Sequence, residues 1–192
     1  MIIGITGSVG SGKSTIAKIF SKHHYARIDA DEIAHKILQS KKIIKTLSLE
    51  FGSEIIKNNA IDREIFGNLV FNDDIKLKKL NSIIHPMITA EIKKEIIKIR
   101  KKNGPKAKII VDAPLLLEVG AEELVDKIIV IKASNNSIIS RNRRFTKEQI
   151  ENILKHQMPL EEKMKYADFM IDNDKNFSNT EKQITDIIKS LE

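Results

Sequence analysis

The chain has 192 residues and a formal charge of +7, from 33 lysine and arginine residues against 26 aspartate and glutamate residues. This length predicts one domain, and the 41% of apolar residues excludes a disordered chain. The absence of cysteine excludes a disulfide scaffold, a thiolate zinc site and a cysteine nucleophile. No apolar run approaches the roughly 18 residues of a membrane-spanning helix, and the first residues resemble a strand rather than a signal peptide, so we expect a cytoplasmic protein. The excess of positive charge suggests an anionic partner.

Five short runs rich in β-branched residues predict buried parallel strands. They span residues 2–6, 26–28, 108–111, 127–131 and 169–171, of which the second is the weakest. Helical patterns separate them and start at Ser14, Pro86 and Ser178. Pro86 suits the first turn of a helix that extends to Lys102, and Ser178 with Glu181 three residues later has the spacing of a capping box. Strands alternating with helices predict an α/β domain with a mostly parallel sheet.

The interval from residue 32 to 103 interrupts this alternation. It contains no convincing strand, although the sheet should have continued. We therefore expect a helical insertion over 32–103 within a single domain that covers residues 1–192. We expect the insertion to shape a substrate pocket.

A glycine-rich segment follows the first predicted strand. Residues 7–14 fit the pattern G-x-x-x-x-G-K-S, in which glycines let the backbone approach phosphate oxygens. The lysine, Lys13, can reach the β- and γ-phosphates, and the hydroxyl of Ser14 can bind Mg²⁺. The pattern alone can occur by chance, but a strand before it and a helix after it are the expected context. The sequence therefore predicts a nucleotide phosphate site, with ATP contacts from Gly10, Ser11, Gly12, Lys13, Ser14 and Thr15.

Acidic residues follow two of the predicted strands. Asp112 ends the strand at 108–111, where a carboxylate can hold Mg²⁺ through a water molecule, although capping of the loop beside Pro114 is an alternative. Asp31 follows the second strand, at the edge of the sheet where ligands bind in open α/β folds. A carboxylate there could accept the proton of an attacking hydroxyl. Its neighbour Asp29 has capping-box spacing with Glu32, so an N-cap is at least as plausible there as chemistry.

Three arginines, Arg141, Arg143 and Arg144, follow the fourth predicted strand. A solvated basic stretch is the ordinary interpretation. In a protein with a phosphate loop, however, an arginine-bearing lid can close over the nucleotide and stabilise the charge of phosphoryl transfer. Closure also excludes water, so that the phosphoryl group is not lost to hydrolysis. We expect a lid over about residues 135–160, with Arg144 and Arg141 as its candidate catalytic residues.

Several motifs, in order along residues 2–174, resemble the dephospho-CoA kinase family. They are I-G-I-T-G before the phosphate loop, I-D-A-D at 28–31, D-R at 62–63, L-N-S-I-I-H-P at 80–86, D-A-P-L-L-L-E at 112–118, Q-M-P at 157–159, Lys163, A-D at 167–168 and I-D-N at 171–173. The phosphate loop is shared by many families. The combination of the later motifs is far more specific.

The resemblance implies a three-layer P-loop kinase core with a five-stranded parallel sheet, a helical insertion on the CoA side and a lid. It implies ATP-dependent phosphorylation of the ribose 3′-hydroxyl of dephospho-CoA, the last step of coenzyme A synthesis. Lys13 and Ser14 would then hold the phosphates and Mg²⁺, and Asp31 would be the candidate base. The acceptor side would comprise Asp31, Arg63, His85, Pro86, Asp112 and Leu116.

Two other functions fit parts of the sequence. A nucleoside or nucleotide kinase would share the phosphate loop but take another small acceptor. A nucleic-acid-binding ATPase would explain the basic charge, but aromatic residues are only 5% of the chain and tryptophan is absent, which argues against a base-stacking surface. We therefore expect ATP and dephospho-CoA as partners, no nucleic acid or membrane, and a monomer or weak homo-oligomer.

Overall fold

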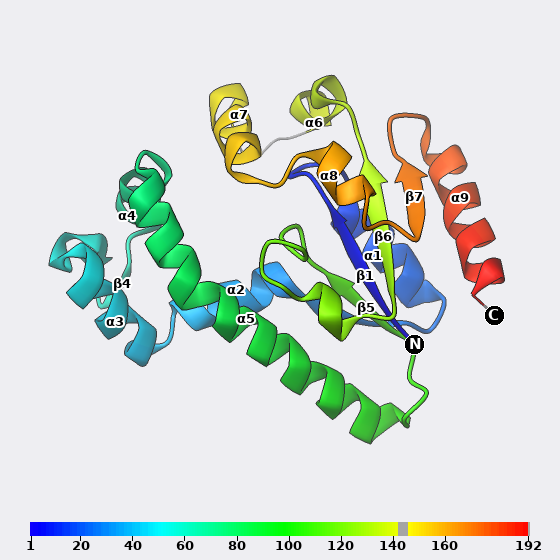
Figure 1. Cartoon of the computed structure of the whole chain (residues 1–192), viewed down its shortest axis with the longest axis horizontal. Helices are drawn as coiled ribbons and strands as arrows, with labels where there is room; N and C mark the ends of the chain where they lie inside the picture. Colours follow the sequence, from blue (N-terminus) through cyan, green and yellow to red (C-terminus); the bar gives the residue numbers. More distant parts are fainter. Residues whose placement is uncertain (142–145, 192) are drawn as a thin grey trace. The chain divides into compact units, whose positions relative to one another are not determined.

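The computed structural model describes residues 1–141 and 146–191 (Figure 1). The chain forms two compact units, one from Met1–Ala30 with Ile92–Glu192 and the other from Asp31–Glu91. The larger unit contains the parallel sheet, and the smaller one is mainly helical. The expected insertion reached residue 103, whereas the smaller compact unit ends at Glu91, inside a long helix.

The sheet of the larger unit has five strands in the order β2-β5-β1-β6-β7, and every neighbouring pair is parallel. The strands are β1 (Ile2–Gly7), β2 (Ala26–Asp29), β5 (Ile109–Asp112), β6 (Lys127–Lys132) and β7 (Phe169–Asp172). These bounds confirm the five predicted strands to within about one residue. Because β1 lies at the centre, the loop that follows it emerges from the middle of the carboxyl edge, where ligands bind in open α/β sheets.

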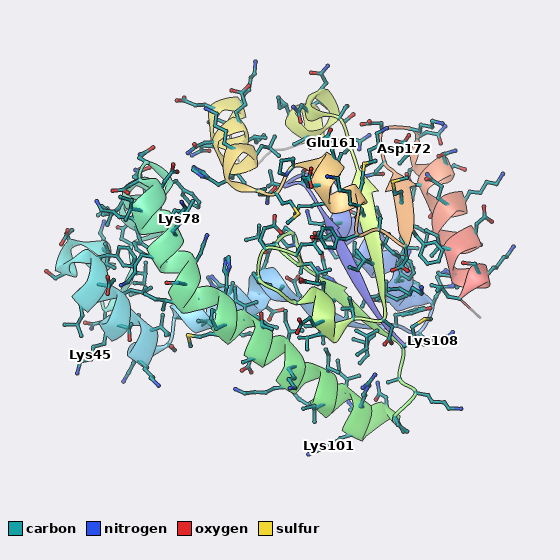
Figure 2. The ribbon with its side chains drawn as sticks, in the orientation of Figure 1. Lys45, Lys78, Lys101, Lys108, Glu161 and Asp172 are labelled. Atoms are coloured by element: carbon teal, nitrogen blue, oxygen red, sulfur yellow. The ribbon has the colours of Figure 1, made fainter. Side chains whose placement is uncertain are left out.

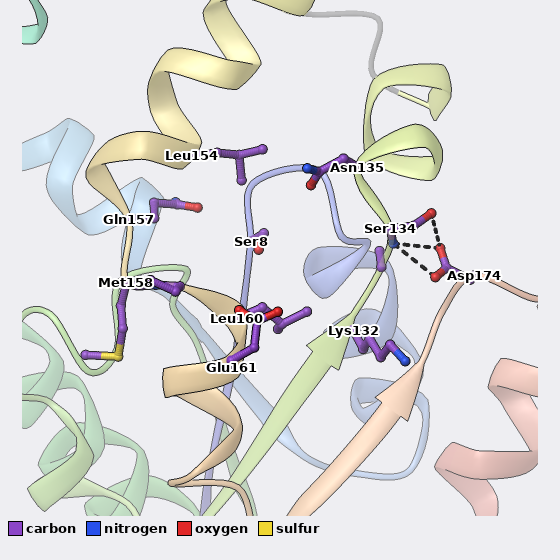
Figure 3. A pocket seen from close by; sticks show the side chains of 12 residues that line it. Ser8, Lys132, Ser134, Asn135, Leu154, Gln157, Met158, Leu160, Glu161 and Asp174 are labelled. Carbon is purple, nitrogen blue, oxygen red and sulfur yellow. Dashed lines mark hydrogen bonds between the residues drawn. The ribbon is translucent and has the colours of Figure 1, made fainter.

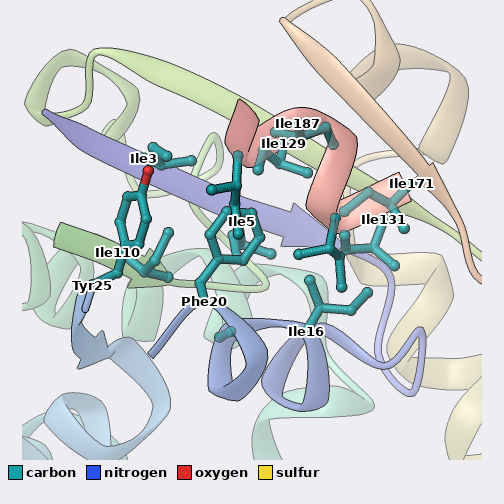
Figure 4. Packing of buried hydrophobic residues seen from close by; sticks show 13 residues of the cluster. Ile3, Ile5, Ile16, Phe20, Tyr25, Ile110, Ile129, Ile131, Ile171 and Ile187 are labelled. Carbon is teal, nitrogen blue, oxygen red and sulfur yellow. The ribbon is translucent and has the colours of Figure 1, made fainter. Parts of the chain in front are cut away.

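One face of the sheet packs against helices α1 (Lys13–Lys22) and α9 (Phe177–Ser190). Side chains alternate along a strand, so Ile3 and Ile5 of β1 both point to this face, where they are fully buried. Phe20 and Tyr25 close the cluster with an edge-to-face contact of 5.4 Å between ring centroids (Figure 4). This apolar layer holds α1 against the sheet, and the first residues of α1 complete the phosphate loop.

The other face of β1 is covered by the loop after β5. Gly4 points to this face, and a Cβ added to it would lie only 2.5 Å from Leu116, which is fully buried. Thr6 also points there and donates a hydrogen bond to the carbonyl of Pro114 at 3.1 Å. The glycine at position 4 is therefore needed for close packing of the loop that follows Asp112. A short helix, α8 (Leu160–Met164), also contacts β1 and β6.

Three further helical segments belong to the larger unit, namely η2 (Glu122–Leu124), α6 (Asn135–Arg141) and α7 (Lys147–His156). The capping box predicted at the last helix is wrong, because α9 begins earlier. Asn176 is its N-cap, and the Asn176 side chain accepts a hydrogen bond from the backbone N–H of Asn179. A capping box does occur at α7, between Thr146 and Gln149.

The smaller unit contains helices α2 (Ala30–Leu38, whose first residue belongs to the larger unit), α3 (Lys41–Phe51), η1 (Ser53–Ile55) and α4 (Arg63–Phe71), together with the beginning of α5 (Asp74–Asn103). Its core includes an edge-to-face pair, Phe51 and Phe66, with ring centroids 5.3 Å apart. The unit also contains a hairpin of two-residue strands, β3 (Ile56–Lys57) and β4 (Ala60–Ile61), that was not expected from the sequence. Its turn residues Asn58 and Asn59 both have positive φ, which asparagine tolerates and tight hairpins require.

The helix predicted to begin at Pro86 in fact runs from Asp74 to Asn103, with Pro86 in its interior. His85, the residue before Pro86, lies within the same helix. Four isoleucines spaced by four residues, Ile84, Ile88, Ile92 and Ile96, are buried along this helix, whereas Pro86 is exposed. Burial of this continuous stripe outweighs the one backbone hydrogen bond that proline removes.

Part of the positive charge lies on exposed faces of the helices. Lys45 of α3, Lys78 of α5 and Lys101 near the end of α5 are all exposed (Figure 2). Their positions fit the ordinary interpretation of solvated helix faces. Within the described ranges, no helix combines the length and the apolar composition that crossing a membrane requires.

Candidate active site

The phosphate loop connects the central strand β1 to helix α1, as the motif predicts. Gly7 has φ 147° and Gly12, the N-cap of α1, has φ 94°, both outside the range of ordinary side chains. A Cβ on Gly7 would lie 2.6 Å from the carbonyl of Ile131, and one on Gly12 would collide with the side-chain amide of Asn173. The loop geometry therefore demands glycine at these positions, and it aims the first N–H groups of α1 at an anion site.

Lys13 is buried, and its Nζ donates a hydrogen bond to the carbonyl of Ser8 at 2.7 Å. A buried ammonium group inside a glycine-rich loop is suited to exchange this carbonyl for phosphate oxygens. The hydroxyl of Ser11 is also buried and has no hydrogen-bond partner among the described residues. Ser14 and Thr15 are exposed on the first turn of α1. The predicted ATP contacts thus share one loop and one helix terminus.

The carboxylate of Asp112 is held by an arginine that the sequence analysis missed. Arg27 of β2 donates to Asp112 Oδ2 from Nε at 3.2 Å and from an Nη atom at 2.5 Å, and it also bonds Asp29 at 2.6 Å. Burial lowers the pKa of Arg27, but hydrogen bonding to Asp112 and the charges of Asp112 and Asp29 outweigh burial and raise the pKa overall. The only sequence signal for Arg27 was a charged residue inside an otherwise apolar strand.

The two predicted magnesium ligands lie in the same unit. Among the described residues no three histidine, cysteine, aspartate or glutamate side chains form a metal-binding group. Magnesium bound to a nucleotide does not need such a group, since it usually takes one or two protein ligands, several waters and phosphate oxygens. The exposed hydroxyl of Ser14 and the carboxylate of Asp112 are hard oxygen donors of this kind, so these residues fit the ion.

Only part of the predicted lid lies within the described residues. Arg143 lies outside them, and so does Arg144, one of the two candidate catalytic arginines. Arg141 ends α6, and its guanidinium donates to the backbone carbonyl of Asn173 at 2.5 Å. Helices α6 and α7 share a small apolar cluster, in which Val9 of the phosphate loop packs against Ile138 and Ile150. Both helices therefore adjoin the phosphate loop.

Asn173, the last residue of the I-D-N motif, links three elements. Its side-chain Nδ2 donates to the carbonyl of Ser11 at 2.8 Å, and its Oδ1 accepts from the buried hydroxyl of Thr180 at 3.0 Å. Because the Ser11 carbonyl can only accept, the amide nitrogen must face the phosphate loop, and Oδ1 then accepts from Thr180. With Arg141 on its backbone carbonyl, Asn173 joins the loop, α6 and α9. This linking role of Asn173 was not expected from the sequence.

A pocket of about 390 Å³ opens beside Ser8, between the end of β6 and the segment that joins α7 to α8 (Figure 3). Asp174 borders it and accepts hydrogen bonds from the backbone N–H and the hydroxyl of Ser134 at 2.8 and 2.9 Å. The backbone hydrogen bond from Ser134 is the main cause that lowers the pKa of Asp174. Gln157 and Met158 line the opposite side of the pocket.

The residues predicted for the acceptor belong to several elements of the two units. Asp31 is exposed in the first turn of α2, two residues beyond the end of β2. Arg63 begins α4, and His85 and Pro86 lie in the middle of α5. Leu116 is fully buried beside Gly4, which makes it a packing residue of the larger unit. The substrate roles of these five residues and of Asp112 stay predictions.

Comparison with known proteins gives a consistent result. The family model described as dephospho-CoA kinase matches residues 1–179. A dephospho-CoA kinase of Fusobacterium nucleatum is 38% identical over 189 residues, covering 96% of this chain and 95% of that protein. One of Aquifex aeolicus is 36% identical over 197 residues and covers 98% and 96% of the two chains.

Solved structures agree with these sequence relationships. A dephospho-CoA kinase from Campylobacter jejuni is 32% identical, with a TM-score of 0.71 over 99% of this chain and 96% of that one. A shikimate kinase from Bacteroides thetaiotaomicron, with 14% identity and a TM-score of 0.54 over 100% and 98% of the chains, supports the fold alone. The expected P-loop kinase fold is confirmed. From its sheet, its phosphate loop and these matches over almost its whole length, the chain belongs to the dephospho-CoA kinase family.

Proposed function

We propose that the protein transfers the γ-phosphoryl group of ATP to the ribose 3′-hydroxyl of dephospho-CoA, giving ADP and coenzyme A. The match to the family model over residues 1–179 carries this proposal, because it covers the acceptor motifs as well as the phosphate loop. The buried lysine within a glycine-rich loop supports the choice of a nucleoside triphosphate as donor.

On the donor side, the loop and Lys13 bind the triphosphate. The Lys13 ammonium exchanges the Ser8 carbonyl for oxygens of the β- and γ-phosphates, so little reorganisation is needed when ATP binds. The buried Ser11 hydroxyl offers a further hydrogen-bond donor. Ser14 and Asp112 would hold Mg²⁺, Asp112 through a water molecule, and the ion would neutralise charge on the phosphates. Two hydrogen bonds from Arg27 hold the Asp112 carboxylate in place.

On the acceptor side, we propose that Asp31 accepts the proton of the ribose 3′-hydroxyl. The hydroxyl oxygen then forms a bond to the γ-phosphorus, while the bond from that phosphorus to the bridging oxygen breaks and ADP leaves. An arginine of the 141–144 segment would stabilise the charge on the transferring oxygens. Most of the rate enhancement would come from positioning and electrostatics, since this chemistry needs no covalent intermediate.

ADP formation with and without dephospho-CoA tests the proposal, with nucleosides, nucleotides, DNA and RNA as competing acceptors or activators. We expect acceleration by dephospho-CoA and a product that is heavier by one phosphoryl group. Turnover with a nucleoside and none with dephospho-CoA would indicate the alternative kinase, and activation only by nucleic acid would indicate an ATPase. In the same assay Asp31→Asn should lower kcat by more than it weakens ATP binding, and equal turnover would remove Asp31 as the base.

A further inference from the structure

Two motifs far apart in the sequence meet through one buried lysine. The side chain of Lys163 is fully buried in α8, and its Nζ contacts Glu118 Oε1 at 2.8 Å and the carbonyl of Pro114 at 2.6 Å. The same Glu118 oxygen accepts a hydrogen bond from the backbone N–H of Met158 at 2.9 Å. The D-A-P-L-L-L-E motif therefore fixes the backbone of the Q-M-P motif at the point where α7 ends.

Fixing Met158 places the adjacent Gln157 against the phosphate loop. The side-chain Oε1 of Gln157 accepts a hydrogen bond from the backbone N–H of Val9 at 3.0 Å. Val9 is the third residue of the loop motif and lies 148 positions before Gln157. This hydrogen bond joins the end of α7 directly to the segment that carries Lys13.

The Gln157 contact acts on Lys13 through a single peptide group. The N–H of Val9 and the C=O of Ser8 belong to the same peptide, and in a planar trans peptide they point in opposite directions. When Gln157 holds the N–H on one side, the carbonyl must point to the other. There it accepts the hydrogen bond from Lys13 Nζ at 2.7 Å.

We propose that Gln157 is a positioning residue that orients the Ser8–Val9 peptide and thereby holds Lys13 inside the phosphate loop before the nucleotide binds. The inference deepens the proposed function and rests on it for the use of ATP. Without an acceptor at position 157, the Val9 N–H loses its partner and the peptide can rotate. The loop must then be ordered during binding, which lowers affinity for the triphosphate.

The test measures two properties of Gln157→Met, a variant that keeps the side-chain length but lacks an acceptor. One is hydrogen exchange of the Val9 amide in the nucleotide-free protein, and the other is the Kd for ATP without any acceptor substrate. One neutral hydrogen bond contributes about 0.5–1.5 kcal/mol, so we expect both to change by about 3- to 10-fold. Gln157→Glu retains an acceptor and should keep Val9 protected, even though its charge weakens ATP binding.

Asp126→Ala is the matched control. Asp126 accepts a hydrogen bond from the backbone N–H of Ile2 at 2.7 Å. Ile2 begins strand β1, and the phosphate loop follows the other end of this strand. This variant should accelerate exchange at Ile2, leave Val9 protected and keep the Kd for ATP within about twofold. It therefore separates general weakening of β1 from loss of the contact at the loop.

Three results would overturn the inference. They are an unchanged Val9 exchange rate in Gln157→Met, faster exchange with an unchanged Kd, and a weaker Kd with Val9 still protected. Should Gln157→Met fail to fold, loss of Val9 protection in the folded Gln157→Glu protein would also contradict it. Failure of the proposed function is distinguishable, since wild type would then bind ATP but not phosphorylate dephospho-CoA.

Discussion

Replacing Lys163 with methionine should destabilise the fold strongly. Methionine keeps the apolar stem but removes the ammonium group, and Glu118, with a side chain only 14% exposed, then loses its cation. Its second oxygen, Oε2, already has no hydrogen-bond partner among the described residues. A buried carboxylate without its cation must be desolvated with no compensating ion pair, so most of the effect comes from Glu118 rather than from position 163 itself.

The structure allows an estimate of the size of this effect. Removing one partner of a buried ion pair costs about 3–5 kcal/mol. For a chain of this length each kcal/mol lowers the melting temperature by about 2–4 °C, so we expect a decrease of about 6–20 °C. The double variant with Glu118→Gln should be less destabilised than the sum of the two single variants, because the carboxylate charge is removed together with its partner.

Urea unfolding followed by circular dichroism measures these free energies. Lys165→Met is the matched control, because Lys165 follows the same helix and pairs with Glu162 at 2.7 Å, but their side chains are 67% and 50% exposed. An exposed pair contributes at most about 1 kcal/mol. A loss below about 1 kcal/mol for Lys163→Met, equal to that of the control, would refute the argument from burial.

Three further changes are expected to have measurable effects. Arg27→Met should lower the free energy of unfolding measured in urea by about 2–4 kcal/mol, because it leaves the buried Asp112 carboxylate unpaired. Arg27→Lys should recover part of this loss. An unchanged urea midpoint in Arg27→Met would show that the ion pair is dispensable. Gly12→Ala, at φ 94°, should weaken ATP binding by about tenfold or more in a calorimetric titration, and normal affinity would mean that the loop adapts. Hydrogen bonding from Lys127, with that from a backbone N–H, lowers the pKa of Asp168 below its ordinary 3.8. The ionised carboxylate of Asp168 therefore stabilises the fold above the unfolded pKa, and this stabilisation is lost as the pH falls through the folded pKa. Asp168→Asn should therefore be less stable than wild type at pH 7 but not in strong acid. A difference in melting temperature that does not depend on pH would contradict this.

Much of the fold was predictable because its signals are local. A strand buried on both faces must be a short run of β-branched residues, and all five such runs form the sheet. The phosphate loop was predictable for a similar reason, since glycine positions, lysine and hydroxyl lie within residues 7–14. Local signals failed where packing outweighed them, as at Pro86, which lies within a helix because a buried isoleucine stripe continues past it.

The fold class, the phosphate loop and the family motifs can be recognised without a structure, because each depends on residues close together in the chain. Which motifs meet depends on the tertiary fold. Arg27 and Asp112 are 85 positions apart and become partners because β2 and β5 are neighbours in the sheet. Gln157 reaches Val9 because Glu118 and Lys163 fix the end of α7 from a different part of the chain. Strand order and burial set these contacts, and neither leaves a periodic pattern in the sequence.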